Sequence, residues 1–359
     1  MHSAGSVANK GYRGGFLPAL GFALAAILGC ASEPPIDVPS PRAILEVHAR
    51  GVHALAYAPD GKLFASAGGT EESGSDSISL WVNVTGEHQL TFANYKGIVV
   101  SLAFSPDGKL LAVGGENGRI VLLDVDTGAE RIVSSGKVEG VAAMSFSFDG
   151  KVLVSVSVSP LGETVVRRLE VATGEARDTF SPEAASRVAL APEGGSLAWP
   201  VSEESPGLRV LDLESRKSRF LPKISIGQDD PITFSPDGKW LAAVHLESWN
   251  PIPNRCPYLY LVEAASGRVR LRSPRAFGAR RGLALSHNGK LLARGIDRGV
   301  ELWDLKTLEV QATVDESWQR SEGAELLLFS PDDQTLLSSD GRGRLLLWEV
   351  ARLRDSRRE

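Results

Sequence analysis

The chain is short of cysteine and has no excess of basic residues, and both shortages exclude classes of protein. Only Cys30 and Cys256 occur in 359 residues, so the fold cannot rest on a disulfide framework and must rest on strand pairing and burial. The formal net charge is −5 at pH 7, which removes the usual electrostatic argument for nucleic acid as a partner. The composition therefore describes an acidic protein that is long enough to bury its own core.

Motifs for catalysis and metal binding are also missing. The six histidines are scattered, and no His/Cys/Asp group has metal-ligand spacing. There is neither a Gly-x-Ser-x-Gly elbow nor a Gly-x-x-x-x-Gly-Lys-[Ser/Thr] phosphate loop. Several Asp-Gly pairs resemble fragments of calcium loops, but turn formation accounts for each of them. We expect no catalytic residues, no cofactor and no bound metal.

The chain does contain one turn sequence that recurs many times. Residues 101–128 (SLAFSPDGKLLAVGGENGRIVLLDVDTG) show it best. Pro106 pre-sets φ for a type I turn, Asp107 can bond its own backbone, and Gly108 takes the positive φ that closes a hairpin. The apolar segments around these turns are expected to form strands at 101–104, 110–113 and 120–125.

About seven copies of this turn follow one another roughly 42 to 51 residues apart, a period typical of β-propeller blades. The copies are centred on Asp60, Asp107, Asp149, Glu193, Asp237, Asn288 and Asp332. A second landmark, the end of a third strand, follows each copy; in three blades it carries a tryptophan, at Trp81, Trp303 and Trp348. We expect these three side chains in the core between blades.

The third-strand ends also resemble a known family. Residues 300–305 (VELWDL) and 345–350 (LLLWEV) are similar to the closing strand of WD40 repeats, and the resemblance covers about Arg42 to Leu353. It implies an all-β, seven-bladed propeller of four-stranded blades. The Gly-His pair of the family is absent and most repeats lack the tryptophan, so the family's buried His–Ser/Thr–Asp–Trp hydrogen bonds are not assumed. Looser propellers with the same turn, such as the TolB-like ones, remain an alternative.

Both ends of the chain are predicted to close the ring. The last third strand ends near Val350, and the nine residues after it are rich in arginine and do not read as a strand. The fourth strand of the last blade should therefore come from Ala43 to Val47, which removes an exposed edge. We predict one propeller domain at 42–353 and a basic tail at 354–359.

Residues 1–29 are predicted to be a signal peptide. Lys10 and Arg13 precede an apolar run, 16–28, that is too short to span a bilayer. The run ends in Ile-Leu-Gly-Cys, which resembles the bacterial lipobox and implies a lipid anchor on Cys30. An uncleaved signal-anchor or an ordinary secretory peptide is the alternative. Residues 30–41 would form a Pro-rich tether.

The lipobox resemblance places the protein in the bacterial cell envelope, held to a membrane through Cys30. Residue 31 is Ala rather than Asp. By similarity to lipoprotein sorting, this favours the periplasmic side of the outer membrane if the source is Gram-negative. We expect a monomer.

Insertions between the blades point to one binding face. In a WD40-type blade, the second-to-third-strand loops and the blade-to-blade connections emerge on one side, and here these are the long segments, above all 245–257, 273–281 and 314–323. Aromatic and arginine side chains gather in them, as in interface hot spots. The candidate partner-binding residues are Trp249, Arg255, Tyr258, Phe277, Arg280, Trp318 and Arg320.

The leading interpretation is a lipid-anchored, non-catalytic scaffold that binds a protein through this face, similar in plan to propeller lipoproteins that assist outer-membrane protein assembly. A propeller enzyme of the lactonase or quinoprotein-dehydrogenase type is the alternative, with a site at the channel mouth. A sugar- or peptide-binding propeller is a third possibility. Acids for an enzyme site could come from Glu71, Asp76, Glu203, Glu204, Glu247 and Asp315. Fold alone does not separate these functions.

Overall fold

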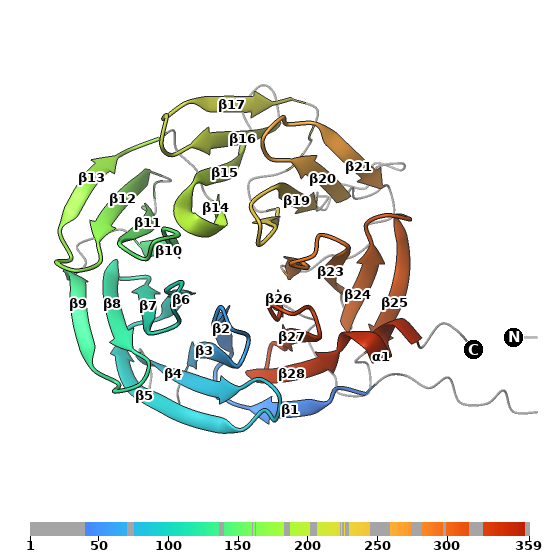
Figure 1. Cartoon of the computed structure of the whole chain (residues 1–359), viewed down its shortest axis with the longest axis horizontal. Helices are drawn as coiled ribbons and strands as arrows, with labels where there is room; N and C mark the ends of the chain where they lie inside the picture. Colours follow the sequence, from blue (N-terminus) through green and yellow to red (C-terminus); the bar gives the residue numbers. More distant parts are fainter. Residues whose placement is uncertain are drawn as a thin grey trace, which may run out of the picture. The chain divides into compact units, whose positions relative to one another are not determined.

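The structure, a computed structural model, is a closed ring of seven blades, each a four-stranded antiparallel sheet (Figure 1). It describes residues 40–69, 75–135, 140–159, 161, 163–182, 187–201, 207–222, 224, 226, 230–244, 259–273, 282–296, 299–315 and 326–355. The predicted all-β, seven-bladed propeller is confirmed.

The strands of each blade follow one another from the centre of the ring outward. The innermost strands are β2 (Val52–Tyr57), β6 (Val99–Phe104), β10 (Gly140–Phe146), β14 (Ala189–Leu190), β18 (Ile232–Phe234), β22 (Leu283–Leu285) and β26 (Leu327–Phe329). The second strands are β3 (Leu63–Gly69), β7 (Leu110–Gly115), β11 (Val152–Val158), β15 (Ser196–Val201), β19 (Trp240–Val244), β23 (Leu291–Ile296) and β27 (Thr335–Ser339).

The third strands are β4 (Ser75–Val82), β8 (Arg119–Asp124), β12 (Thr164–Glu170), β16 (Gly207–Asp212), β20 (Leu259–Glu263), β24 (Gly299–Asp304) and β28 (Arg344–Glu349). The outermost strands are β5 (His88–Lys96), β9 (Glu130–Ser135), β13 (Ala176–Phe180), β17 (Ser218–Leu221), β21 (Val269–Ser273), β25 (Glu309–Asp315) and β1 (Ala43–Glu46). Two short helices complete the described elements, the 3₁₀ turn η1 (Pro192–Gly194) and α1 (Val350–Asp355).

Ring closure occurs as predicted. β1 pairs antiparallel with β28, from Ala43 opposite Leu347 to Glu46 opposite Arg344, and so completes the seventh blade. After β28 the chain forms α1 instead of a strand, and Leu353 on this helix is buried. The outer edge of the last blade is thus supplied from the other end of the sequence.

The repeated turn is held by its own side chains. In the second blade the Ser105 hydroxyl donates to Asp107 Oδ1 at 2.6 Å, and the same oxygen accepts the backbone N–H of Lys109 at 3.1 Å. Gly108 adopts φ 71°, which favours glycine. The third, fifth and seventh blades repeat the serine–aspartate bond at Ser147, Ser235 and Ser330.

The core lies between the blades. The second and third strands are buried on both faces because each blade is packed between two neighbours, as in β7 and β8. Trp81, Trp303 and Trp348 are 8%, 2% and 1% exposed, which confirms their predicted place in the core.

Arginines on the outer part of the ring join neighbouring blades. Arg42, beside β1, donates to the carbonyl of Asn83 in the first blade at 2.5 Å. Arg168 donates in the same way to Leu213 at 2.5 Å, and Arg131 and Arg219 donate to carbonyls of the blade that follows each of them. These bonds supplement the apolar packing at the junctions.

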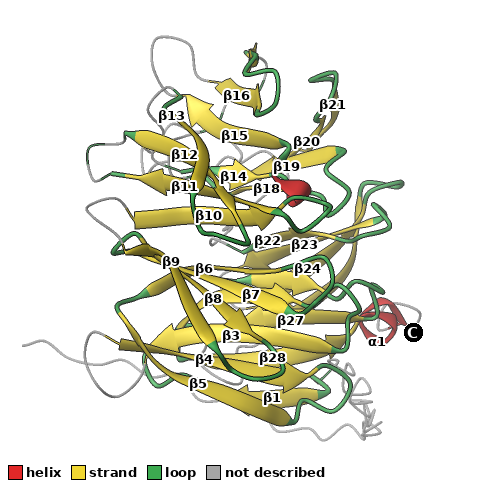
Figure 2. Ribbon diagram, turned by 60° about the vertical axis from the view of Figure 1, so that its left-hand side comes forward, coloured by secondary structure: helices red, strands yellow, loops and turns green. Residues whose placement is uncertain are grey.

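The two faces of the ring differ in their connections. We call the side with the second-to-third-strand loops and the blade-to-blade connections the loop face, and the side with the Ser-Pro-Asp-Gly turns the turn face. Figure 2 shows the strands edge-on, with many of the short described turns along one side. No helix in the described part of the chain is long and apolar enough to cross a membrane.

Candidate functional site: the loop face at the ring closure

The seven predicted partner-binding residues and the predicted lipidation site lie outside the described residues. They are Trp249, Arg255, Tyr258, Phe277, Arg280, Trp318, Arg320 and Cys30. Of the acids considered for an enzyme site, Asp76 is described with its contacts, whereas Glu71, Glu203, Glu204 and Glu247 lie outside the described part. The site below is therefore built from the loop face of the seventh, first and second blades.

A pocket of about 470 Å³ opens on the loop face where the two ends of the sequence meet. One wall is the end of β1 and the connection that follows it, and the other is the turn that leads into β28. The lining residues are Glu46, Val47, His48, Ala49, Arg342, Gly343 and Arg344. We call this pocket the seam pocket.

The two walls of the seam pocket are in direct backbone contact. The carbonyl of Gly343 accepts the N–H groups of Val47 and His48, at 3.4 and 3.1 Å. A Cβ at Gly343 would lie 1.6 Å from the carbonyl oxygen of His48, and its φ is 84°. Only glycine permits this approach, so the shape of the pocket is fixed by the backbone.

Asp340 orients the arginine at the base of the pocket. Its carboxylate is buried and accepts the Nε–H of Arg344 at 2.6 Å together with the backbone N–H groups of Arg342 and Arg344. The Nη2 of Arg344 is buried and has no hydrogen-bond partner. No ion pair involves Arg342 or Glu46 among the described residues. The pocket thus presents an oriented guanidinium with free donor capacity.

A buried hydrogen-bond set supports the floor of this region. His48 Nε2 lies 2.9 Å from Ser66 Oγ, and Trp81 Nε1 donates to the same oxygen at 2.9 Å. His48 Nδ1 lies 3.2 Å from Ser77 Oγ. Burial lowers the pKa of His48 to about 4, so the ring is neutral at pH 7. The set holds the connection between β1 and β2 against the first blade.

The pKa of a second histidine on the same face is shifted in the opposite direction. His53 Nδ1 lies 2.8 Å from the buried carboxylate of Asp76, which also accepts the backbone N–H of Val99 at 2.8 Å. The hydrogen bond that His53 donates to Asp76 raises the pKa of His53. Asp76 therefore ties the first blade to the first strand of the second. The described residues hold no group of three acids, histidines or cysteines that could bind a metal.

The sixth blade replaces the Ser–Trp bond with an ion pair. Arg294 is 1% exposed and donates from Nη2 to Glu301 Oε2 at 2.6 Å. Trp303 Nε1 donates to the same oxygen at 3.0 Å. Since Nε and Nη1 of Arg294 have no partner, this blade carries a buried cation with free donors.

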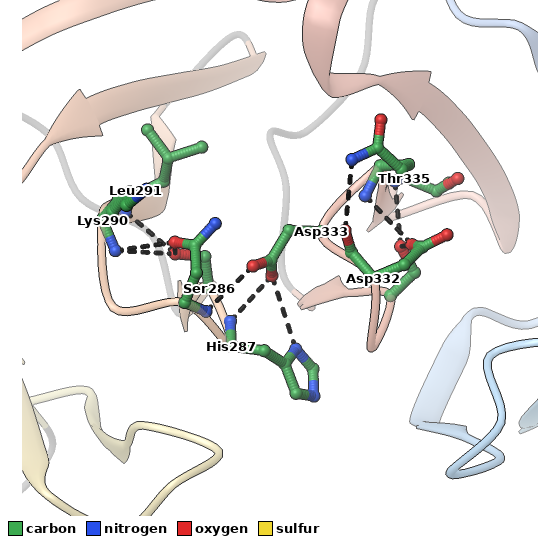
Figure 3. Close-up of polar contacts among 10 residues, drawn as sticks. Ser286, His287, Lys290, Leu291, Asp332, Asp333 and Thr335 are labelled. Carbon is green, nitrogen blue, oxygen red and sulfur yellow. Dashed lines mark hydrogen bonds and ion pairs between the residues drawn. The ribbon is translucent and has the colours of Figure 1, made fainter.

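A polar junction between the sixth and seventh blades lies on the turn face (Figure 3). Asp333 accepts the backbone N–H groups of His287 and Asn288, at 2.7 and 2.9 Å. His287 Nδ1 lies 3.5 Å from the same carboxylate, and burial lowers the pKa of His287. The junction is structural in its contacts, because both carboxylate oxygens are engaged with backbone.

Family comparisons agree with this architecture. Residues 39–81 match the WD domain, G-beta repeat, and residues 79–148 match the WD40 domain of anaphase-promoting complex subunit 4. These matches support a WD40-repeat β-propeller and cover residues 39–148 of the chain. Its first blade keeps a buried His–Ser–Trp set, which sequence reasoning missed because Val47, not glycine, precedes His48. The spacing between His48 and the Asp60 turn was the signal that could have found it.

Among solved structures, this WD40 propeller is similar to a chain of Kuenenia stuttgartiensis hydrazine synthase. The TM-score is 0.67 at 17% identity, over 85% of this chain and 97% of that chain. At such an identity the likeness shows the fold alone. No curated protein matches the chain in sequence.

Proposed function

We propose that this WD40 propeller is a non-catalytic scaffold that binds a partner protein through its loop face. The seam pocket carries the proposal, because it combines walls fixed by backbone contact with two arginines, Arg342 and Arg344. Arginine is enriched at interface hot spots because one side chain combines apolar area with several donors. The predicted aromatic and arginine residues of the long loops, Trp249 and Trp318 among them, would extend the same surface.

β1 crosses the seventh blade from one face of the ring to the other. Arg42, just before β1, bonds Thr335 and Asn83, which lie beside turns of the turn face. β1 then runs toward the loop face and ends at Glu46 in the seam pocket. A lipid on Cys30 would hold the protein in the bacterial cell envelope, as the lipobox resemblance implies.

Photo-crosslinking in the native cell tests the scaffold proposal. A crosslinking amino acid at Arg342, Trp249 or Trp318 should capture one discrete protein, and the same group at Asp60 or Asp149 on the turn face should not. Capture of no protein from any loop-face position would contradict the proposal.

A further inference from the structure

We propose that the seam pocket is a carboxylate-binding site that takes an acidic segment of the partner protein. This inference rests on the proposed scaffold function and names the chemistry of the partner at one place on the loop face. It follows from three features of the pocket: its charges, the orientation of Arg344, and the rigidity of its walls.

Basic and acidic side chains lie on opposite walls of the seam pocket. Arg342 and Arg344 lie two residues apart on one wall, and Glu46 is the acid of the other wall. Glu46 stands directly opposite Arg344 in the strand register, yet Arg344 forms its ion pair with Asp340. Asp340 therefore balances the charge of Arg344, and Arg342, which has no ion pair among the described residues, is the cation that remains available to an anion.

Arg344 is positioned in advance for a planar anion. Asp340 is 2% exposed and holds the guanidinium through Nε, and Nη2 has no hydrogen-bond partner among the described residues. A guanidinium fork matches a carboxylate in geometry and charge, and holding it in place beforehand reduces the entropy lost on binding. Nη2 is buried, so a bound carboxylate would have to displace its cover to reach this donor.

The walls are rigid enough to define a site. Gly343 packs on the His48 carbonyl, and His48 is held in turn by Ser66 and Ser77. A volume of about 470 Å³ lies within the range of ligand pockets. Glu46 at the rim would accept N–H groups of the ligand backbone and repel a second carboxylate, which favours a peptide with spaced acids.

Binding of a defined peptide to the purified full-length protein in detergent tests this assignment. The probe is a fluorescent hexaglutamate with blocked ends, and hexaglutamine is the uncharged reference. Fluorescence anisotropy should show tighter binding of hexaglutamate. Arg342→Glu should weaken that binding by about tenfold, because it reverses a charge at the site. The fold should survive, since Asp340 uses only the backbone N–H of residue 342.

Two matched variants make the test specific. Glu46→Gln should strengthen hexaglutamate binding, because it removes the repelling carboxylate. Arg352→Glu should leave binding unchanged, because this exposed arginine is on α1 and paired with Glu349, away from the pocket. Equal binding of the two peptides, or equal losses from Arg342→Glu and Arg352→Glu, would overturn the assignment. Displacement of the peptide by micromolar succinate would overturn it in favour of a small carboxylate.

The Arg342→Glu variant distinguishes failure of this inference from failure of the proposed scaffold function. If Arg342→Glu abolishes hexaglutamate binding and also abolishes capture of the cellular partner from Trp318, the assignment stands. If partner capture persists unchanged in that variant, the scaffold stands and the seam pocket is not its acidic-peptide site.

Discussion

The carboxylate of Asp333 accepts the backbone N–H of His287 at 2.7 Å, across the junction between the sixth and seventh blades. Both residues depart from the repeated turn, and they do so together. His287 occupies the position that is proline in Pro59, Pro106 and Pro331, and Asp333 occupies the glycine position with φ 58°. Proline has no N–H at this position, whereas His287 has one, and Asp333 of the seventh blade accepts it.

Replacing Asp333 alone by the consensus glycine should lower the free energy of unfolding. Restoring both consensus residues should lower it less. Asp333→Gly removes the acceptor of two backbone N–H groups, which costs about 1–3 kcal/mol, and relieves the positive φ, which returns about 1 kcal/mol. The double variant His287→Pro/Asp333→Gly should regain part of the loss, because the His287 N–H no longer needs a partner whereas the Asn288 N–H still does. Urea unfolding of the single and double variants measures this. A double variant less stable than Asp333→Gly would contradict the compensation.

Acid should destabilise the ring through His48. Its folded pKa of about 4 lies below the unfolded value near 6.5, so the unfolded chain binds the extra proton as pH falls between these values. Stability should fall over that window, by on the order of 3 kcal/mol from this residue. In His48→Gln the slope of unfolding free energy against pH should be shallower between pH 6.5 and 4. His287, whose pKa is also lowered, retains part of the slope.

His53 provides a control of the opposite sign. Its pKa is raised in the fold, so its contribution is present below the unfolded value and is lost as pH rises through the folded pKa. His53→Gln should therefore remove a stabilisation that acid favours and make acid destabilisation steeper. Parallel slopes in the two variants would show that neither histidine titrates as its surroundings indicate.

Gly343 should be the least replaceable glycine of the seam. Gly343→Ala forces a Cβ to within 1.6 Å of the His48 carbonyl oxygen at φ 84°, and we expect a loss of more than about 3 kcal/mol. Gly195→Ala is the matched control, because a Cβ there meets nothing within 4 Å and φ is −81°. Thermal unfolding should show a large drop in Tm for the first and little change or a small gain for the second. Similar values for both would mean that the seam is not rigid.

The lipid anchor depends on one residue. Cys30→Ala should abolish labelling by a fatty-acid analogue and move the protein from the membrane fraction to the soluble fraction. Cys256→Ala is the control and should change neither result. Membrane retention of Cys30→Ala at the wild-type level would defeat the lipoprotein prediction.

The repeated turn predicted the ring because the hydrogen bonds that form the turn join residues close in sequence. Asp107 and Gly108 interact with neighbours in sequence, so their spacing alone marks every blade. The closing strand followed from counting strands, and β1 at Ala43–Glu46 agrees with the prediction at 43–47. The prediction placed Trp81, Trp303 and Trp348 correctly, because large apolar side chains at the ends of third strands are buried between neighbouring blades.

The seam pocket could not be predicted in the same way. It brings Glu46 together with Arg342, which are nearly 300 residues apart and belong to no common motif. The hydrogen bond between Asp333 and His287 likewise joins two blades. In the sequence, each residue alone is only a departure from the Ser-Pro-Asp-Gly consensus of its own turn. The aromatic and arginine residues singled out in the long loops remain predictions.

The most direct measurement is photo-crosslinking in the native cell from Arg342 and Trp318, with Asp60 and Asp149 on the turn face as controls. A scaffold that uses its loop face should yield one discrete protein adduct from Arg342 and Trp318 and none from Asp60 or Asp149. Adducts from the turn face alone, or no protein adduct from any of the four positions, would contradict the account.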